Sequence, residues 1–147
     1  MATAERAVAG LRRPPWGVAA LGAAGAPHRL KRPSADLLDR IARGEVDAAL
    51  DAEILQEVLH RYRAIDRWKD GRQLYDLARA LFPAVLPVTA EVLDEARSLL
   101  DELPEASARD AIHAAACRVY GAEAICSWDR DFDRFEGLKR LEPGQIA

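Results

Sequence analysis

Three aspartates at alternate positions follow an apolar run near the end of the sequence. Asp129, Asp131 and Asp133 lie in the stretch SWDRDFDRF, directly after residues 122–126, which are apolar except for one glutamate. Carboxylate oxygens are hard ligands, so clustered aspartates can hold a divalent cation such as Mg²⁺ or Mn²⁺. A solvated polar turn is the alternative interpretation, and the rest of the sequence is needed to distinguish the two.

Two further acids stand where a site could form. Glu57, in AEILQEVLHRYR, is flanked by apolar residues on both sides, which places it near the buried stripe of a helix. Asp110 follows Ser107 by three positions, so it lies in the first turn of the helix that Ser107 caps, where a carboxylate is favoured. Each has a plainer interpretation: Glu57 as a solvated residue, and Asp110 as the partner of Ser107 in a capping box.

The other polar candidates are weaker. His28, His60 and His113 are scattered along the chain, and each is better interpreted as a surface or core histidine than as a metal ligand. Three arginines beside the acids are candidates for phosphate contacts, although most arginines are simply solvated: Arg109, Arg130 and Arg134.

The elements that must position these acids alternate between strand and helix. Caps and apolar periodicity predict helices over 34–43 (capped by Ser34), from Asp51 through Tyr62, over 70–81 and 90–103, and from Ser107 to Gly121. Short apolar runs predict strands at 46–50, 84–88, 123–128 and, less regularly, 138–142. This alternation predicts an α/β fold with a parallel sheet.

A parallel sheet brings the predicted acids together. Ligands gather where parallel strands end, because each chain leaves its strand at the same edge of the sheet. Asp129 follows strand 123–128, and Glu57 and Asp110 lie early in helices that can face the same edge. Convergent carboxylates without a histidine or cysteine partner favour Mg²⁺ or Mn²⁺, ions that cleave phosphodiesters by activating water.

The totals fit a single domain in a reducing compartment. The chain has 147 residues, half of them apolar and 31% charged, with a net charge of −3 that argues against a broad basic surface. Cys117 and Cys126 match no metal-ligand spacing, so two buried thiols in the cytoplasm are expected. The longest apolar stretch, residues 16–26, is well below the roughly 20 residues that span a bilayer, so no membrane contact is expected.

The first 26 residues differ from the remainder. They are rich in Ala, Gly, Arg and Pro, contain Glu5 as their one acid, and show no sustained periodicity. We therefore expect two parts, an atypical segment at 1–26 and a folded domain at 27–147. Residues 16–22 supply a poor strand at best, and an altered reading frame would explain their composition.

Three segments in this order and spacing resemble a known family. ILQEVLHRY, ARDAIHAAA and ICSWDRDFDRF are similar to segments of the PIN domains of the VapC type, over about residues 25–143. The resemblance implies a three-layer α/β/α sandwich, Mg²⁺ or Mn²⁺ as cofactor, and endonucleolytic cleavage of RNA as the toxin of a toxin–antitoxin pair. It places family acids on Glu57, Asp110 and Asp129, with Asp131 as a neighbour, and implies a cognate antitoxin and, as one option, a homodimer.

One departure leaves several interpretations open. The family's first strand ends in an aspartate, whereas here no aspartate precedes Asp36, so the first strand is degenerate or missing. The chain is then a VapC-like metal-dependent ribonuclease with an altered first strand, or a catalytically impaired relative that acts by binding protein or RNA. The third interpretation is an ordinary α/β interaction domain whose acids are caps and turns.

Overall fold

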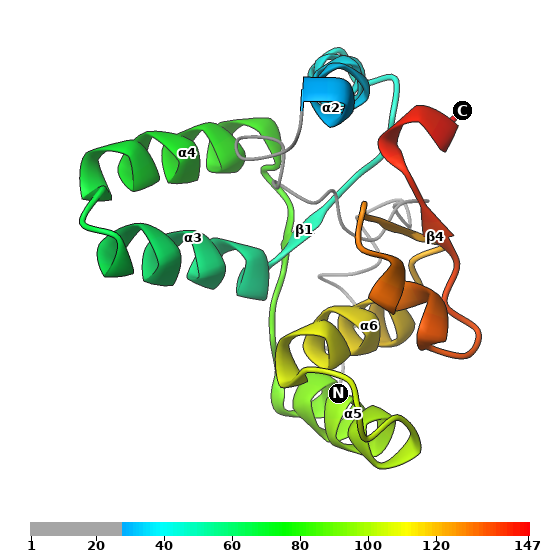
Figure 1. Cartoon of the computed structure of the whole chain (residues 1–147). Helices are drawn as coiled ribbons and strands as arrows, with labels where there is room; N and C mark the ends of the chain where they lie inside the picture. Colours follow the sequence, from blue (N-terminus) through cyan, green and yellow to red (C-terminus); the bar gives the residue numbers. More distant parts are fainter. Residues whose placement is uncertain (1–27) are drawn as a thin grey trace, which may run out of the picture.

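The computed structural model describes residues 28–147, so the expected poor strand at 16–22 and the boundary at residue 26 lie outside the described residues (Figure 1). The chain forms five α-helices, four short strands and two 3₁₀ helices in this described part. In order they are α2 (His28–Ala42), β1 (Leu50–Asp51), α3 (Ala52–Ala64), α4 (Trp68–Leu81), β2 (Val85–Leu86), α5 (Ala90–Glu102), α6 (Ala108–Tyr120), β3 (Ile125–Cys126), η2 (Arg130–Arg134), β4 (Arg140–Leu141) and η3 (Pro143–Gln145).

The helix starts predicted from capping residues are confirmed for three helices. The side chains of Asp51, Thr89 and Ser107 accept hydrogen bonds from backbone N–H groups three residues later, at the first turns of α3, α5 and α6. Gly121 ends α6 in the left-handed conformation, with φ +67°, which glycine adopts without steric cost. These local bonds fix where α3 and α6 begin, and therefore where Glu57 and Asp110 lie along them.

The cap predicted at Ser34 is wrong. Helix α2 begins before Ser34, at His28, and carries Pro33 inside it. Ser34 is buried, and its hydroxyl accepts a hydrogen bond of 3.0 Å from the indole N–H of Trp128, 94 residues away. Ser34 therefore belongs to the packing of α2 against the segment that follows β3, a contact that local sequence does not reveal.

The predicted strands exist, but each is only two residues long. β1 pairs in parallel with β2, with Leu50 opposite Val85, and β3 pairs in parallel with β4, with Ile125 opposite Arg140. The α/β class with parallel strands is thus confirmed, although within residues 28–147 the strands form two separate pairs. β1 nevertheless leads directly into α3, and β3 is followed after residues 127–129 by η2; both helical segments carry predicted site residues.

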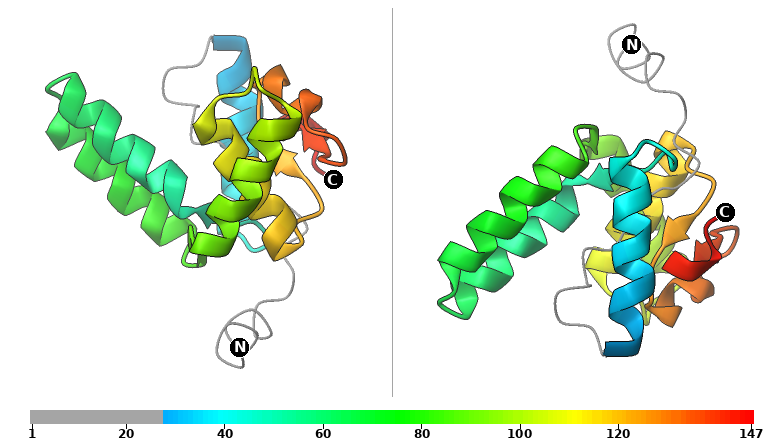
Figure 2. Two further views of the ribbon diagram at one scale, coloured as in Figure 1. Left: turned by 90° about the horizontal axis from the view of Figure 1, so that it is seen from below. Right: turned by 90° about the horizontal axis from the view of Figure 1, so that it is seen from above.

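Small side chains let α6 lie deep in the body of the protein. The buried side chains of α6 are mostly small and let neighbouring elements approach its backbone closely: Ala111, residues 114–116 and Cys117. Helix α5 lies alongside α6 (Figures 1 and 2), and its own buried residues are Val92, Ala96 and Leu99. Both cysteines are free and buried, as predicted, and burial raises the pKa of each thiol to about 12, which makes them unreactive.

Helices α3 and α4 form an antiparallel hairpin that projects from the rest of the molecule (Figures 1 and 2). The two helices approach closely because Gly71 has no side chain; a Cβ there would lie 2.4 Å from Cβ of Tyr62. The base of the hairpin, where α3 begins, meets the body at β1, so the start of α3 is held firmly and its far end is exposed. No helix among residues 28–147 is long and apolar enough to cross a membrane.

Candidate active site

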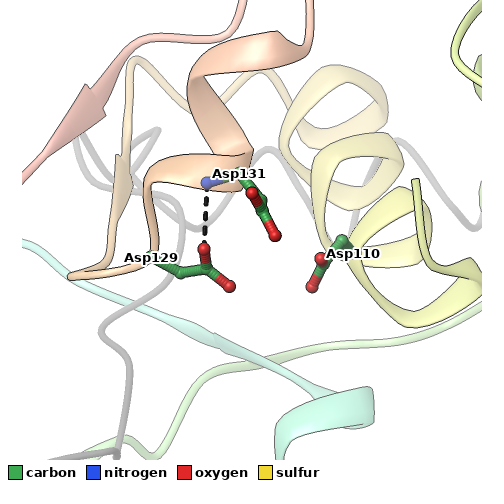
Figure 3. Close-up of side chains that lie close together, drawn as sticks. All are labelled: Asp110, Asp129 and Asp131. Atoms are coloured by element: carbon green, nitrogen blue, oxygen red, sulfur yellow. Dashed lines mark hydrogen bonds between the residues drawn. The ribbon is translucent and has the colours of Figure 1, made fainter. Parts of the chain in front are cut away.

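Three of the predicted acids meet between the start of α6 and η2. One carboxylate oxygen each of Asp110, Asp129 and Asp131 can be chosen so that all three lie within 4.8 Å of one another. Figure 3 shows the three side chains directed into the same space, Asp110 from the first turn of α6 and the other two from the segment after β3. We call these residues the three-aspartate cluster.

The chain after β3 is shaped by its own side chains. The buried Ser127 hydroxyl accepts a hydrogen bond of 3.0 Å from the backbone N–H of Asp129, and Asp129 Oδ1 accepts one of 2.9 Å from the N–H of Asp131 (Figure 3). Asp129 thereby caps η2, and the tight turn brings Asp129 and Asp131 to the same side. Asp110 is set by the Ser107 cap, whose hydroxyl accepts from the Asp110 N–H at 3.1 Å.

The third aspartate of the alternating run has a different role. Asp133 Oδ1 accepts a hydrogen bond of 2.9 Å from Nε of Arg140, and Arg140 also donates to the carbonyl of Ser127 and to Glu142. The Arg140 side chain is only 11% exposed, and the bond to Asp133 is the main cause that raises its pKa. Asp133 therefore fastens η2 to β4, so the polar-turn interpretation applies to this aspartate.

The electrostatics of the cluster favour a bound cation. Desolvation by burial raises the pKa of Asp110, and the negative charges of Asp129 and Asp131 raise it further, against the Ser107 hydrogen bond and His113, which lower it. Arg134 is a basic partner of the cluster, with its Nη2 3.6 Å from Asp131 Oδ1. Three carboxylates with no histidine or cysteine among them make a donor set that fits Mg²⁺ or Mn²⁺.

Glu57 lies at a neighbouring position, paired with two basic side chains of α6. Its Oε1 is 2.8 Å from Nη1 of Arg109, and its Oε2 is 3.6 Å from Nε2 of His113. Burial opposes ionisation of Glu57, but these two partners together lower its pKa. Glu57 is not part of the three-aspartate cluster, and its direct coordination of a metal stays a prediction.

Sequence reasoning missed one pair of this site. Asp51 is fully buried, and its Oδ2 accepts a hydrogen bond of 2.6 Å from Nδ1 of His113, which is itself buried. Burial lowers the pKa of His113, yet its bonds to Asp51 and Glu57 and their charges raise it to about 9. A signal existed, because Asp51 follows its strand just as Asp129 follows strand 123–128.

The arginines differ in their surroundings. Arg109 is half exposed and lies between Glu57 and, at 3.7 Å, Glu53, whose pKa is raised chiefly by burial. Arg134 pairs with Asp131, and Arg130 is exposed at the start of η2. All three candidates for phosphate contacts therefore lie on the two elements that carry the cluster.

The sequence of the chain is similar to those of known proteins. The PIN domain family model matches residues 19–138. The chain is 36% identical over 117 residues to VapC ribonuclease Mb1869c of Mycobacterium bovis and to Ribonuclease VapC13 of Mycobacterium tuberculosis, which covers 80% of this chain and 89% of each relative. It is 31% identical over 107 residues to Ribonuclease VapC23 of Mycobacterium tuberculosis, which covers 73% of this chain and 84% of that relative.

Proposed function

The chain belongs to the PIN-domain family, and we propose that it acts as a metal-dependent endoribonuclease of the VapC type, the toxin of a toxin–antitoxin pair. The observation that carries this proposal is the three-aspartate cluster. Its members come from two segments that meet only in the folded protein, within 4.8 Å of one another. Relatives that bear the ribonuclease name match four fifths of the chain, which supports the same activity.

Mg²⁺ or Mn²⁺ is the proposed cofactor, held by Asp110, Asp129 and Asp131. A divalent ion bound there supplies a more acidic water and stabilises negative charge on the phosphate. The protein contributes half-buried and exposed carboxylates on rigid elements, and the partial desolvation of Asp110 strengthens its interaction with a cation. We propose Glu57 as a further ligand of this ion, directly or through water, and as a catalytic residue that acts from α3.

RNA is the proposed substrate, and local rather than global charge attracts it. The net charge of −3 repels a polyanion at long range. Arg134 contacts Asp131, Arg109 contacts Glu57, and Arg130 is exposed at the start of η2; guanidinium groups are suited to phosphate oxygens. We propose that these arginines hold the RNA backbone while the aspartates hold the ion. A cognate antitoxin, a homodimer and a cytoplasmic location complete the proposal.

A second candidate function follows from one feature of the sequence. No aspartate precedes Asp36, so the acid that the family resemblance places on a first strand is absent. A catalytically impaired domain that binds RNA or an antitoxin without cleaving RNA would fit this loss. The two candidates differ in a single measurable property, which is cleavage.

An RNA cleavage assay tests the proposal. The purified chain should cut RNA in the presence of Mg²⁺ or Mn²⁺, and EDTA should stop the reaction. Asp110→Asn should remove the activity with little change in stability, because the Ser107 cap bonds the backbone N–H at this position. Full activity in EDTA, or unchanged cleavage by Asp110→Asn, would overturn the metal mechanism, whereas metal-dependent RNA binding without cleavage would favour the second candidate.

A further inference from the structure

The Asp51 carboxylate joins two elements through its two oxygens. Oδ1 accepts a hydrogen bond of 3.1 Å from the backbone N–H of Ile54 and so caps α3, while Oδ2 lies 2.6 Å from Nδ1 of His113 on α6. An ionised carboxylate only accepts, so Nδ1 of the imidazole must carry the hydrogen. This bond fixes the orientation of the ring and leaves Nε2 as the edge that faces away from Asp51.

That edge faces Glu57. Nε2 of His113 lies 3.6 Å from Oε2 of Glu57, and Nη1 of Arg109 lies 2.8 Å from Oε1, so both carboxylate oxygens of Glu57 meet side chains of α6. The ring is also held by Phe132 of η2, edge to face, with centroids 6.3 Å apart. The histidine thus touches groups from α3, β1 and η2, the elements around the three-aspartate cluster.

We propose that Asp51 and His113 are positioning residues, which together with Arg109 hold the carboxylate of Glu57 in place beside the first turn of α6. This inference rests on the proposed function, because it concerns an acid that acts in that site. Partners that orient metal-site and catalytic side chains affect metal affinity or activity about 10- to 100-fold. His113 and Arg109 flank Asp110 on α6. The contacts that hold the Glu57 carboxylate therefore also fix its position relative to the three-aspartate cluster.

Helix capping by itself does not explain a buried carboxylate at position 51. The hydroxyls of Thr89 and Ser107 cap α5 and α6 through the same bond, without placing a charge in the interior. Burying an ionised group costs free energy that only a good partner offsets. What Asp51 adds to a hydroxyl cap is the second oxygen, and that oxygen bonds His113 alone among the hydrogen bonds of the described residues.

A double-mutant cycle tests the proposal. Asp51→Ser keeps a capping hydroxyl but removes the oxygen that orients His113, and Glu57→Gln removes the acid that the ring is proposed to hold. Calorimetric titration with Mn²⁺ measures the metal affinity of the wild type, both single variants and the double variant. We expect Asp51→Ser to weaken Mn²⁺ binding about tenfold in the wild-type background and less than about twofold once Glu57 is Gln.

Cleavage kinetics and two further variants complete the experiment. Asp51→Ser should lower kcat with KM nearly unchanged, as expected when an acid is misplaced and RNA binding is intact. If Asp51→Ser does not fold, Arg109→Gln replaces it in the cycle, because the Arg109 side chain is 52% exposed and that of its partner Glu57 is 33% exposed. His60→Gln, on the exposed face of α3, is the control and should match the wild type.

The outcomes separate this inference from the proposed function. Equal weakening by Asp51→Ser in both backgrounds, or no weakening, would overturn the positioning role. If Asp110→Asn binds Mn²⁺ and cleaves RNA like the wild type, the proposed function itself fails. If Asp110→Asn loses both while the cycle is additive, the function stands and only the role of Asp51 and His113 is wrong.

Discussion

The three alternate aspartates of SWDRDFDRF have two different roles. Asp129 and Asp131 join Asp110 in the cluster, whereas Asp133 bonds Arg140. Strict alternation would place all three on one face of a strand, but this segment is a 3₁₀ helix from Arg130 to Arg134 with about three residues per turn. The difference between neighbouring aspartates is therefore a matter of local geometry, and it can be tested.

Substitution of two aspartates in the same 3₁₀ helix should change the cleavage rate to very different extents. Asp131→Asn removes a negative charge from the cluster and should lower the rate of metal-dependent cleavage at least about tenfold, which corresponds to about 1.4 kcal/mol. Asp133→Asn removes a carboxylate that contacts Arg140 and should leave the cleavage rate within about twofold. Initial rates at saturating Mg²⁺ compare the two. Equal losses of cleavage rate would contradict the assignment of Asp131 to the cluster and of Asp133 to the contact with Arg140.

The buried histidine predicts a pH dependence of stability. The raised pKa of His113, about 9 in the folded protein against 6.5 as its ordinary value, means that the folded state binds the proton more tightly. Its contribution is complete below pH 6.5 and is lost as the pH rises through 9, so the free energy of unfolding should fall by on the order of a few kcal/mol across this window.

Urea unfolding at pH 6 and at pH 9 measures this effect. His113→Gln should lose most of the pH dependence, and His60→Gln should keep it. The comparison with a variant is needed because the two buried thiols, whose pKa values are raised to about 12, also destabilise the folded state above pH 9. A wild-type stability as flat as that of His113→Gln would contradict the assignment of this contribution to His113.

Elements carry the site because helix starts lie at strand ends. β1 leads into α3, and η2 follows β3; Asp51 is the last residue of β1, Asp129 lies after β3, and each caps the helix that comes next. Helix α6 brings Asp110, Arg109 and His113 to the same place from its first two turns. The site residues of α3, Glu53 and Glu57, lie in the first half of this helix, so the packing of the far end of the α3–α4 hairpin can be altered separately.

The close approach of α3 and α4 depends on Gly71. Gly71→Ala would place a Cβ 2.4 Å from Cβ of Tyr62, which forces the two helix backbones apart. Overpacking of this kind costs typically about 1–3 kcal/mol, offset in part by the roughly 1 kcal/mol that alanine gains over glycine in a helix. Urea unfolding should show a net loss of stability.

Gly144→Ala is the matched control, since a Cβ there would meet only Cβ of Pro33 at 3.9 Å, an ordinary contact. Its free energy of unfolding should lie within about 0.5 kcal/mol of the wild type. A Gly71→Ala protein as stable as this control would show that the hairpin adjusts without strain.

The molecule as a whole places its charge unevenly. Acids of the site concentrate between α3, α6 and η2, and a net charge of −3 remains over 147 residues. The family resemblance implies four acids, of which this chain supplies Glu57, Asp110 and Asp129; the first, which the family carries at the end of its first strand, has no counterpart, because no aspartate precedes Asp36. Mg²⁺ is held by few protein ligands and gives up water reluctantly, so each missing carboxylate weakens the site.

Restoring that acid should raise activity. A variant in which residues 16–22 are replaced by an apolar strand ending in aspartate should cleave RNA at least about tenfold faster than the chain as it stands, a gain of about 1.4 kcal/mol in transition-state stabilisation. Mn²⁺ should partly restore the rate of the unaltered chain. Metal titrations of cleavage by both proteins make the comparison. Equal rates would show that the three-aspartate cluster suffices without a further acid.

Local bonds explain what the sequence alone determined. The caps at Asp51, Thr89 and Ser107, the glycine that ends α6 and the parallel order of strands depend on residues within a few positions or on handedness rules, so they could be predicted. The same rules placed Asp110 and Asp129 at one edge, and the cluster forms there. The position of Glu57 near the buried stripe of α3 could be predicted in the same way, whereas its partners on α6, Arg109 and His113, could not.

Only the tertiary structure decided the contacts between distant segments. His113 bonds Asp51 across 62 residues, and Trp128 bonds Ser34 across 94, so no local pattern distinguishes a capping serine from a buried one or a core histidine from a partner of acids. The burial of a side chain depends on which distant segments pack against it. The length of a strand depends on how many of its residues form hydrogen bonds with the neighbouring strand. Both are properties of the whole fold, because desolvation and hydrogen-bond pairing act through space.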